Sequence, residues 1–130
     1  MSWRGMLQQR PLILALWAVL VCCVVVGSLL PAKSSVITTI GRAHISLKVL
    51  HYCAYALLAL MAMIAVRGRP YVALAVVATV LLGVAIEFAQ KLAPGRSCEV
   101  RDMLINGAGA ITGVAVGLVG RRFVPVIDRS

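Results

Sequence analysis

The chain has 130 residues, of which 62% are hydrophobic, and its mean hydropathy is +0.99. This composition excludes an ordinary soluble domain, which is only about 45–50% apolar. The net charge of +9 would suggest nucleic acid in a soluble protein, but here the basic residues lie at the ends of apolar runs. Anionic lipid head groups are therefore the expected partners, and nucleic acid is not.

Four apolar runs are long enough to cross a bilayer, because a helix spans a hydrocarbon core of about 30 Å with about 20 residues. We expect spans at about 11–30, 48–66, 71–90 and 102–120. They predict an all-α polytopic membrane protein, a bundle of four transmembrane helices in a single domain over residues 1–130. The first run is too long for the apolar part of a signal peptide, so we expect it to be retained.

The longest connection runs from Pro31 to Leu47 and is polar, with isoleucines at positions 37, 40 and 45. This interleaving predicts that part of it lies against the membrane surface, where it could act as a lid. Arg4 and Arg10 precede the first span, whereas the acids at 87, 99 and 102 lie at the opposite side. Loop cations alone hardly separate the two orientations, with seven on the side of the termini and six on the other. Because an Arg-flanked first span usually dominates insertion, we expect both termini in the cytoplasm.

The four cysteines show no spacing typical of a metal or redox site, and we expect all of them to be unpaired. Cys22, Cys23 and Cys53 lie inside apolar runs, and Cys98 lies in a polar loop. A metal centre built from His51, Glu87 and Asp102 would lack a close-spaced ligand motif such as H-E-x-x-H, so neither a metal nor a cofactor is expected.

Polar side chains concentrate at one end of the expected bundle. In the second span Lys48, His51, Tyr52 and Tyr55 share an arc of about 100°. Polar residues at the end of the third span and the start of the fourth reach the same side of the membrane. With both termini inside, these groups form a pocket on the extracytoplasmic side. Its expected ligand-binding residues are Lys48, His51, Tyr55, Glu87, Gln90, Arg96, Asp102 and Asn106.

Glu87 lies deep in an apolar run, where an unpaired carboxylate costs a few kcal/mol. Lys48, His51 and Arg96 are its candidate partners. Two interpretations stay open, a buried ion pair that joins helices and a site that handles a ligand. If the site is catalytic, Glu87, His51 and Asp102 are the candidates for acid–base chemistry.

Local signals surround this cluster. Ser97 is a candidate N-cap of the fourth span, and Arg96 and Arg101 lie beside that helix start, where phosphate or carboxylate binds readily. Gly109, Gly113 and Gly117 recur at four-residue spacing. Small residues at this spacing allow two helices in lipid to approach closely, so these glycines are expected to serve helix packing.

These residues resemble the VanZ-like family of small bacterial membrane proteins. The resemblance covers about Lys48 to Gly117 and rests on Lys48-x-x-His51-x-x-x-Tyr55, Glu87-x-x-Gln90 and Arg96-Ser97-x-x-x-x-Asp102-x-x-x-Asn106-x-x-Gly109-x-x-x-Gly113. The family commonly has an acidic residue directly before the lysine, whereas this chain has Leu47. An acid–lysine pair at that point is therefore not expected here.

The resemblance implies a multi-pass protein of the bacterial inner membrane, linked to resistance to the glycopeptide teicoplanin or to handling of envelope lipids. It implies no established enzymatic activity, and it does not identify a protein partner. Three hypotheses remain. The first is a pocket that binds an anionic lipid-linked head group. The second is a membrane enzyme that uses Glu87 or His51 as acid or base on a lipid phosphate or ester, with Arg96 and Lys48 stabilising negative charge, and the third is a purely structural cluster.

Overall fold

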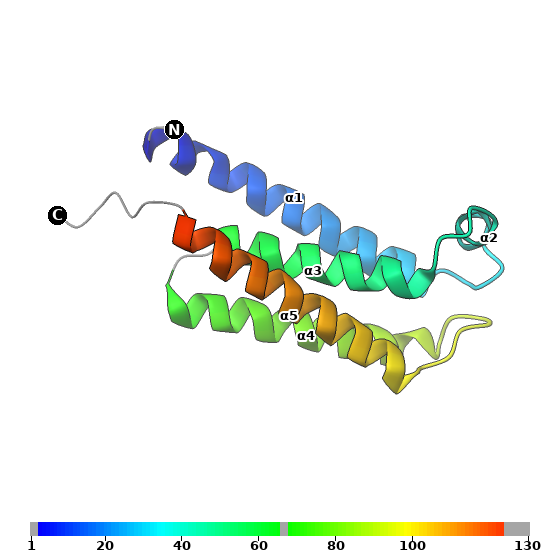
Figure 1. Cartoon of the computed structure of the whole chain (residues 1–130). Helices are drawn as coiled ribbons and strands as arrows, with labels where there is room; N and C mark the ends of the chain where they lie inside the picture. The colour runs from blue at the N-terminus through cyan, green and yellow to red at the C-terminus, as the bar shows by residue number, and fades with distance from the viewer. Residues whose placement is uncertain (1–2, 66–67, 124–130) are drawn as a thin grey trace.

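The computed structural model describes residues 3–65 and 68–123, and these ranges contain helices and no strand. The helices are α1 (Trp3–Leu29), α2 (Ser35–Arg42), α3 (Leu47–Ala65), α4 (Arg69–Gln90) and α5 (Val100–Phe123). Figure 1 shows the four long helices running roughly side by side, with α2 at one end.

The expected all-α architecture with four membrane spans is confirmed. Pro11–Leu29, Leu47–Ala65, Arg69–Gln90 and Val100–Arg122 are each long and apolar enough to cross a membrane. Val66, at the end of the expected second span, lies outside the described residues, as do residues 1–2 and 124–130 of the expected domain. The helix around the first span begins before Pro11, at Trp3.

The short helix α2 was not predicted, because the segment between the first two spans was interpreted as a polar loop. Its N-terminus is capped by Ser34, whose hydroxyl oxygen accepts a hydrogen bond from the backbone N–H of Ile37 at 3.4 Å. Such a cap satisfies one of the N–H groups that a helix start leaves without a partner. Ile37 and Ile40 are half-buried, whereas Thr38, Thr39 and Arg42 are exposed, so α2 is amphipathic.

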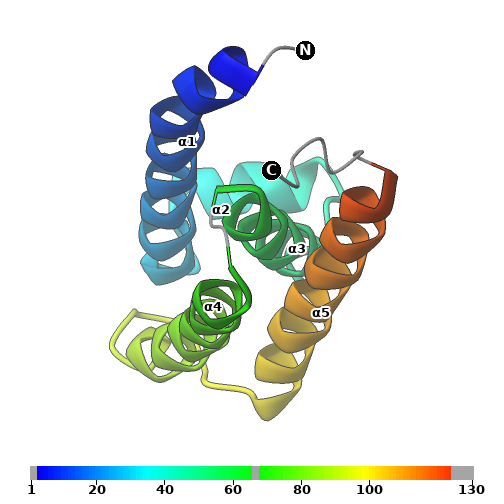
Figure 2. The same ribbon diagram turned by 90° about the vertical axis from the view of Figure 1, so that its left-hand side faces the viewer.

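Helix α3 is central in the bundle, and it contacts α1, α4 and α5. Figure 2 shows α1 and α5 on opposite sides of it. The indole N–H of Trp17 in α1 donates to the carbonyl oxygen of Leu58 in α3 at 3.2 Å. The most extensive contact is that of α3 with α5.

Glycines bring α5 against the backbone of α3. A Cβ added at Gly109 would lie 3.1 Å from the carbonyl carbon of Tyr52, and one at Gly113 would lie 2.9 Å from that of Ala56. Gly117 faces the side chain of Met63 in the same way. In lipid, where no hydrophobic effect drives helices together, such close contact supplies much of the attraction.

Polar contacts flank this glycine seam, which consists of Gly109, Gly113 and Gly117. The hydroxyl groups of Tyr52 and Thr112 are 2.5 Å apart. At the other end of the helix pair, the guanidinium of Arg121 donates to the carbonyl oxygen of Met63. The contact between α3 and α5 is therefore fixed along most of its length.

Large apolar side chains cover the outside of the four long helices. Exposed examples occur on α1 at Leu12, Leu14 and Leu16, on α4 at Leu74, Val77 and Leu81, and on α5 at Leu104, Ile111 and Leu118. The buried apolar core is small and centres on Tyr55, Leu58 and Met63. An apolar exterior around a small core is the pattern of a chain solvated by lipid tails.

The two ends of the bundle differ in composition. Helix α1 begins and α5 ends at one end, which also carries Arg69, Arg121 and Arg122 (Figure 1). The other end carries α2 and the loop 91–99 between α4 and α5. That both termini face the cytoplasm stays a prediction.

Gly113→Ala should destabilise the protein, because the added Cβ would meet the backbone of Ala56, and overpacking typically costs about 1–3 kcal/mol. Gly107→Ala in the same helix is the matched control, because its Cβ would meet nothing within 4 Å. Thermal unfolding in detergent should show a lower Tm for the first variant and an equal or higher Tm for the second. Equal Tm values in both variants would contradict a close seam.

Candidate functional site

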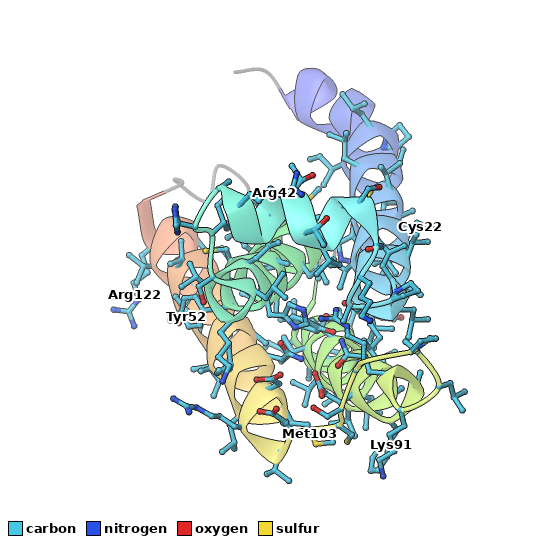
Figure 3. All side chains as sticks on the ribbon, turned by 90° about the vertical axis from the view of Figure 1, so that its right-hand side faces the viewer. Cys22, Arg42, Tyr52, Lys91, Met103 and Arg122 are labelled. Carbon is cyan, nitrogen blue, oxygen red and sulfur yellow. The ribbon has the colours of Figure 1, made fainter. Side chains whose placement is uncertain are left out.

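A polar cavity of about 230 Å³ lies at the end of the bundle that carries α2 and the loop 91–99. Figure 3 views this end and shows side-chain nitrogen and oxygen atoms gathered between the ribbons of α1, α3, α4 and α5. The cavity is lined by Ala32, Ile37, Leu47, Lys48, His51, Gln90, Gly95, Arg96, Ser97, Glu99, Asp102 and Ile105. Five of the eight expected ligand-binding residues are among them: Lys48, His51, Gln90, Arg96 and Asp102.

The lining of this polar cavity carries both signs of charge. Lys48 and Arg96 supply cationic donors, and Glu99 and Asp102 supply carboxylates. Arg96 Nε and Asp102 Oδ1 are buried and have no hydrogen-bond partner in the part of the chain that the structure describes. Two residues of the cavity wall, Arg96 and Asp102, therefore each keep one buried polar atom without a partner.

Gln90 and Arg96 also have a structural task. The side-chain amide of Gln90 donates to the carbonyl oxygen of Ser28 at 3.0 Å, and the guanidinium of Arg96 donates to the same oxygen at 3.2 Å. Ser28 lies in the last turn of α1, where carbonyl groups have no partner within the helix. These two side chains thus hold the end of α1 against α4 and the loop 91–99.

Glu87 is fully buried, with 0% of its surface exposed, and it lines neither of the two cavities at this end. Its Oε2 accepts a hydrogen bond from the backbone N–H of Glu99 at 3.4 Å, so it ties α4 to the start of α5. The hydrogen-bond donor to Glu87 is thus the backbone of Glu99 and not the side chain of Lys48, His51 or Arg96. Its Oε1 has no hydrogen-bond partner among the described residues.

Asn106 is also buried and lies behind the polar cavity rather than in its wall. Gly83 of α4 marks the place where three helices meet, since a Cβ added there would lie 3.0 Å from the ring of Tyr55 and 3.5 Å from the Cβ of Asn106. Glu87 is one turn further along α4. Three expected site residues, Tyr55, Glu87 and Asn106, therefore come together in the interior.

The two tyrosines of α3 point in different directions. Tyr52 turns toward α5 and Thr112 (Figure 3), away from both cavities. Tyr55 is 1% exposed and lines a second, apolar cavity of about 220 Å³ between α1, α2 and α3. The arc expected to carry Lys48, His51, Tyr52 and Tyr55 is therefore divided between two environments.

The start of α5 differs from the prediction. The helix begins at Val100, so Ser97 is not its N-cap; the Ser97 hydroxyl instead donates to Glu99 Oε1 at 3.2 Å. The backbone carbonyl of Glu99 accepts from the N–H of Asp102 at 3.0 Å and starts the helix. The N-cap prediction was wrong because Glu99 is held by Glu87, a contact that short sequence spacing does not reveal.

The loop 91–99 is joined to the connection that follows α1. The N–H of Ala32 donates to the carbonyl oxygen of Pro94 at 3.1 Å. Next to it, Gly95 has a φ of +74°, and a Cβ there would lie 3.1 Å from Ala32, so this position favours glycine. Two segments far apart in sequence thus form one rim of the polar cavity.

Cys22, Cys23, Cys53 and Cys98 are free thiols. Within residues 3–65 and 68–123, no group of three or more histidine, cysteine, aspartate or glutamate side chains is arranged to hold a metal ion.

Sequence reasoning missed Ser28 and the residues of α2 as parts of the site. Ser28 is the only hydroxyl residue in the first apolar run, but it contributes its backbone carbonyl, for which side-chain type gives no signal. Ile37 of α2 lines both cavities. The three-residue spacing of Ile37 and Ile40 could have indicated that both lie on one face of a helix, but the segment was interpreted as a loop.

The sequence profile of the VanZ/LLP1 family matches residues 12–121. This range includes all four spans almost completely and every residue of the polar cavity. No curated protein and no solved structure matches the chain.

Glu87→Gln should leave the fold intact and its stability equal or higher, because the amide keeps an oxygen acceptor for the N–H of Glu99 and has no charge to bury. Glu87→Ala should lower the stability by about 1–3 kcal/mol, because it leaves that N–H without an acceptor. Thermal unfolding in detergent measures both. Unfolding of the Gln variant would indicate that the negative charge itself is needed for folding.

Proposed function

Because the chain belongs to the VanZ/LLP1 family and forms a multi-pass membrane bundle, we propose that its polar cavity binds the head group of an anionic envelope lipid. The observation that carries this proposal is that two residues of the cavity wall, Arg96 and Asp102, each keep one buried polar atom without a hydrogen-bond partner among the described residues. Each unsatisfied group costs about 1–3 kcal/mol, and a bound ligand with complementary groups recovers that cost.

The charged residues of the polar cavity indicate which chemical groups a bound head group would carry. Lys48 and Arg96 suit an anionic group such as phosphate, since charge-assisted hydrogen bonds are roughly twice as strong as neutral ones. Glu99 and Asp102 accept hydrogen bonds and so suit hydroxyl or amine groups. The proposed ligand is thus a lipid phosphate whose head group also carries donors, such as a cell-wall precursor or a polyprenyl phosphate bearing a sugar.

The position of the cavity supports this choice. It lies at one end of the spans, at the level where head groups meet the ends of transmembrane helices. With both termini in the cytoplasm, this end faces outward, where glycopeptides meet their lipid-linked targets. Binding there would alter glycopeptide sensitivity by withholding or presenting such a lipid.

The enzyme hypothesis has less support. A general base must reach its substrate proton within about 3 Å or through one water, whereas Glu87 is fully buried and lines neither cavity. His51 lines both cavities, but the hydroxyl of Ser97, which shares the polar cavity with it, donates to Glu99 Oε1 rather than to the imidazole. Binding is therefore the function that we favour.

Arg96→Ala should abolish selective co-purification of an anionic lipid from bacterial membranes, because it removes the guanidinium at the cavity wall. Native mass spectrometry of the purified protein identifies the lipid and measures the bound fraction. Arg101→Ala is the matched control, since Arg101 is exposed and does not line the cavity. The control should retain the lipid.

Three other outcomes carry information. Loss of lipid in both arginine variants would indicate a general charge effect and argue against the cavity. Absence of any selective lipid from folded wild-type protein would overturn the proposal. Unfolding of Arg96→Ala would favour the structural hypothesis, and Arg96→Lys, which keeps the charge, then serves as the binding test.

Cys98 should react with a membrane-impermeant maleimide added to intact cells, because the proposed topology places the loop 91–99 outside. It is the one cysteine outside the four spans. Ser130→Cys in a Cys98→Ser background should react only after the cells are permeabilised. The opposite labelling pattern would invert the topology.

A further inference from the structure

The apolar cavity between α1, α2 and α3 lies beside the buried core and shares Tyr55 with it. Its walls come from Leu20, Cys23, Val24, Gly27 and Ser28 of α1, from Val36, Ile37 and Ile40 of α2, and from Leu47, Leu50, His51, Ala54 and Tyr55 of α3, with Arg96 from the loop 91–99. Apart from its serine, histidine, tyrosine and arginine, this lining is aliphatic or small. Such a space suits a hydrocarbon chain.

The apolar and the polar cavity are neighbours that share part of their walls. Ile37, Leu47, His51 and Arg96 line both of them. Arg96 therefore borders a polar space on one side and an apolar space on the other. The combined site is amphipathic, with a volume of about 230 Å³ on its polar side and about 220 Å³ on its apolar side.

We infer that one hydrocarbon chain of the bound lipid lies in the cavity between α1, α2 and α3 while its head group occupies the polar cavity. This inference rests on the proposed function and specifies its ligand as a lipid recognised by chain as well as head group. A free sugar phosphate or phosphate ion would leave the apolar side unused.

The helices around the apolar cavity are arranged for such an occupant. Helix α1 contacts α3 and α4 but is mostly exposed, so the cavity lies at the edge of the bundle rather than at its centre. Helix α2 has no buried residue, yet Ile37 and Ile40 turn toward the cavity. A chain in this position would give these isoleucines an apolar contact.

Gly27 offers a way to fill the apolar cavity without disturbing the fold. It lines this cavity, and a Cβ added there would meet nothing within 4 Å. Gly27→Leu should therefore fold and occupy the space of the chain. Gly107→Leu is the matched control, because its Cβ also meets nothing and it lines neither cavity.

The experiment measures the binding of dodecyl phosphate and of butyl phosphate to the purified, delipidated protein by native mass spectrometry. Wild type should bind dodecyl phosphate more tightly, and this binding should require Arg96. Gly27→Leu should lower the affinity for dodecyl phosphate at least about tenfold, which corresponds to about 1.4 kcal/mol. This is less than the free energy that burial of two CH₂ groups contributes. Butyl phosphate should be little affected, and Gly107→Leu should behave as wild type.

The outcomes separate the inference from the function on which it rests. If dodecyl phosphate binding requires Arg96 but is equally tight in Gly27→Leu, the proposed position of the hydrocarbon chain is wrong. The head-group site is then still supported. Binding that is independent of Arg96 overturns both. If Gly27→Leu does not fold, Ala54→Leu fills the same cavity from α3 and gives the same decision.

Discussion

The close backbone contact of α3 with α5 is the constraint on which the rest of the structure depends. It needs glycine at 109, 113 and 117, because a side chain at these positions would meet the α3 backbone or Met63. Once α5 lies there, its first two turns bring Asp102 to the polar cavity and Asn106 to the interior. A packing seam in one half of the bundle thereby positions the polar groups in the other half.

The polar groups then serve the fold and the cavity at the same time. Arg96 donates one hydrogen bond to α1 and keeps a second donor, Nε, without a partner. Glu87 holds the start of α5 and thereby the carboxylates of the cavity wall. A structural and a binding interpretation of this cluster are consequently not exclusive: residues that join the helices also shape the space between them.

Much of the architecture could be predicted from the sequence, because lipid imposes strong rules on length and composition. The four spans follow from apolar runs, and the spacing of the glycines indicated a packing face.

The site was predicted less completely. Spacing on α3 placed Tyr52 and Tyr55 on one arc, but Thr112 of α5 draws Tyr52 away. The partner of Glu87 is a backbone N–H, which no residue pattern encodes, and the same contact displaces the expected cap at Ser97. Helix α2 was missed because Ile37 and Ile40 were interpreted as parts of a loop lying on the membrane surface, although their spacing of three also fits a helix.

The carbonyl group of Ser28 has a consequence for biogenesis. The ribosome delivers α1 first, yet the two side chains that satisfy this carbonyl lie 62 and 68 residues later in the chain. During synthesis α1 can dock early on α3 through Trp17 and Leu58, but its C-terminal end stays without these donors until α4 and the following loop have been inserted. The insertion of α4 and α5 thus completes the hydrogen bonding of α1. Quality control that senses exposed polar backbone in the membrane would act on chains that lack this last hairpin.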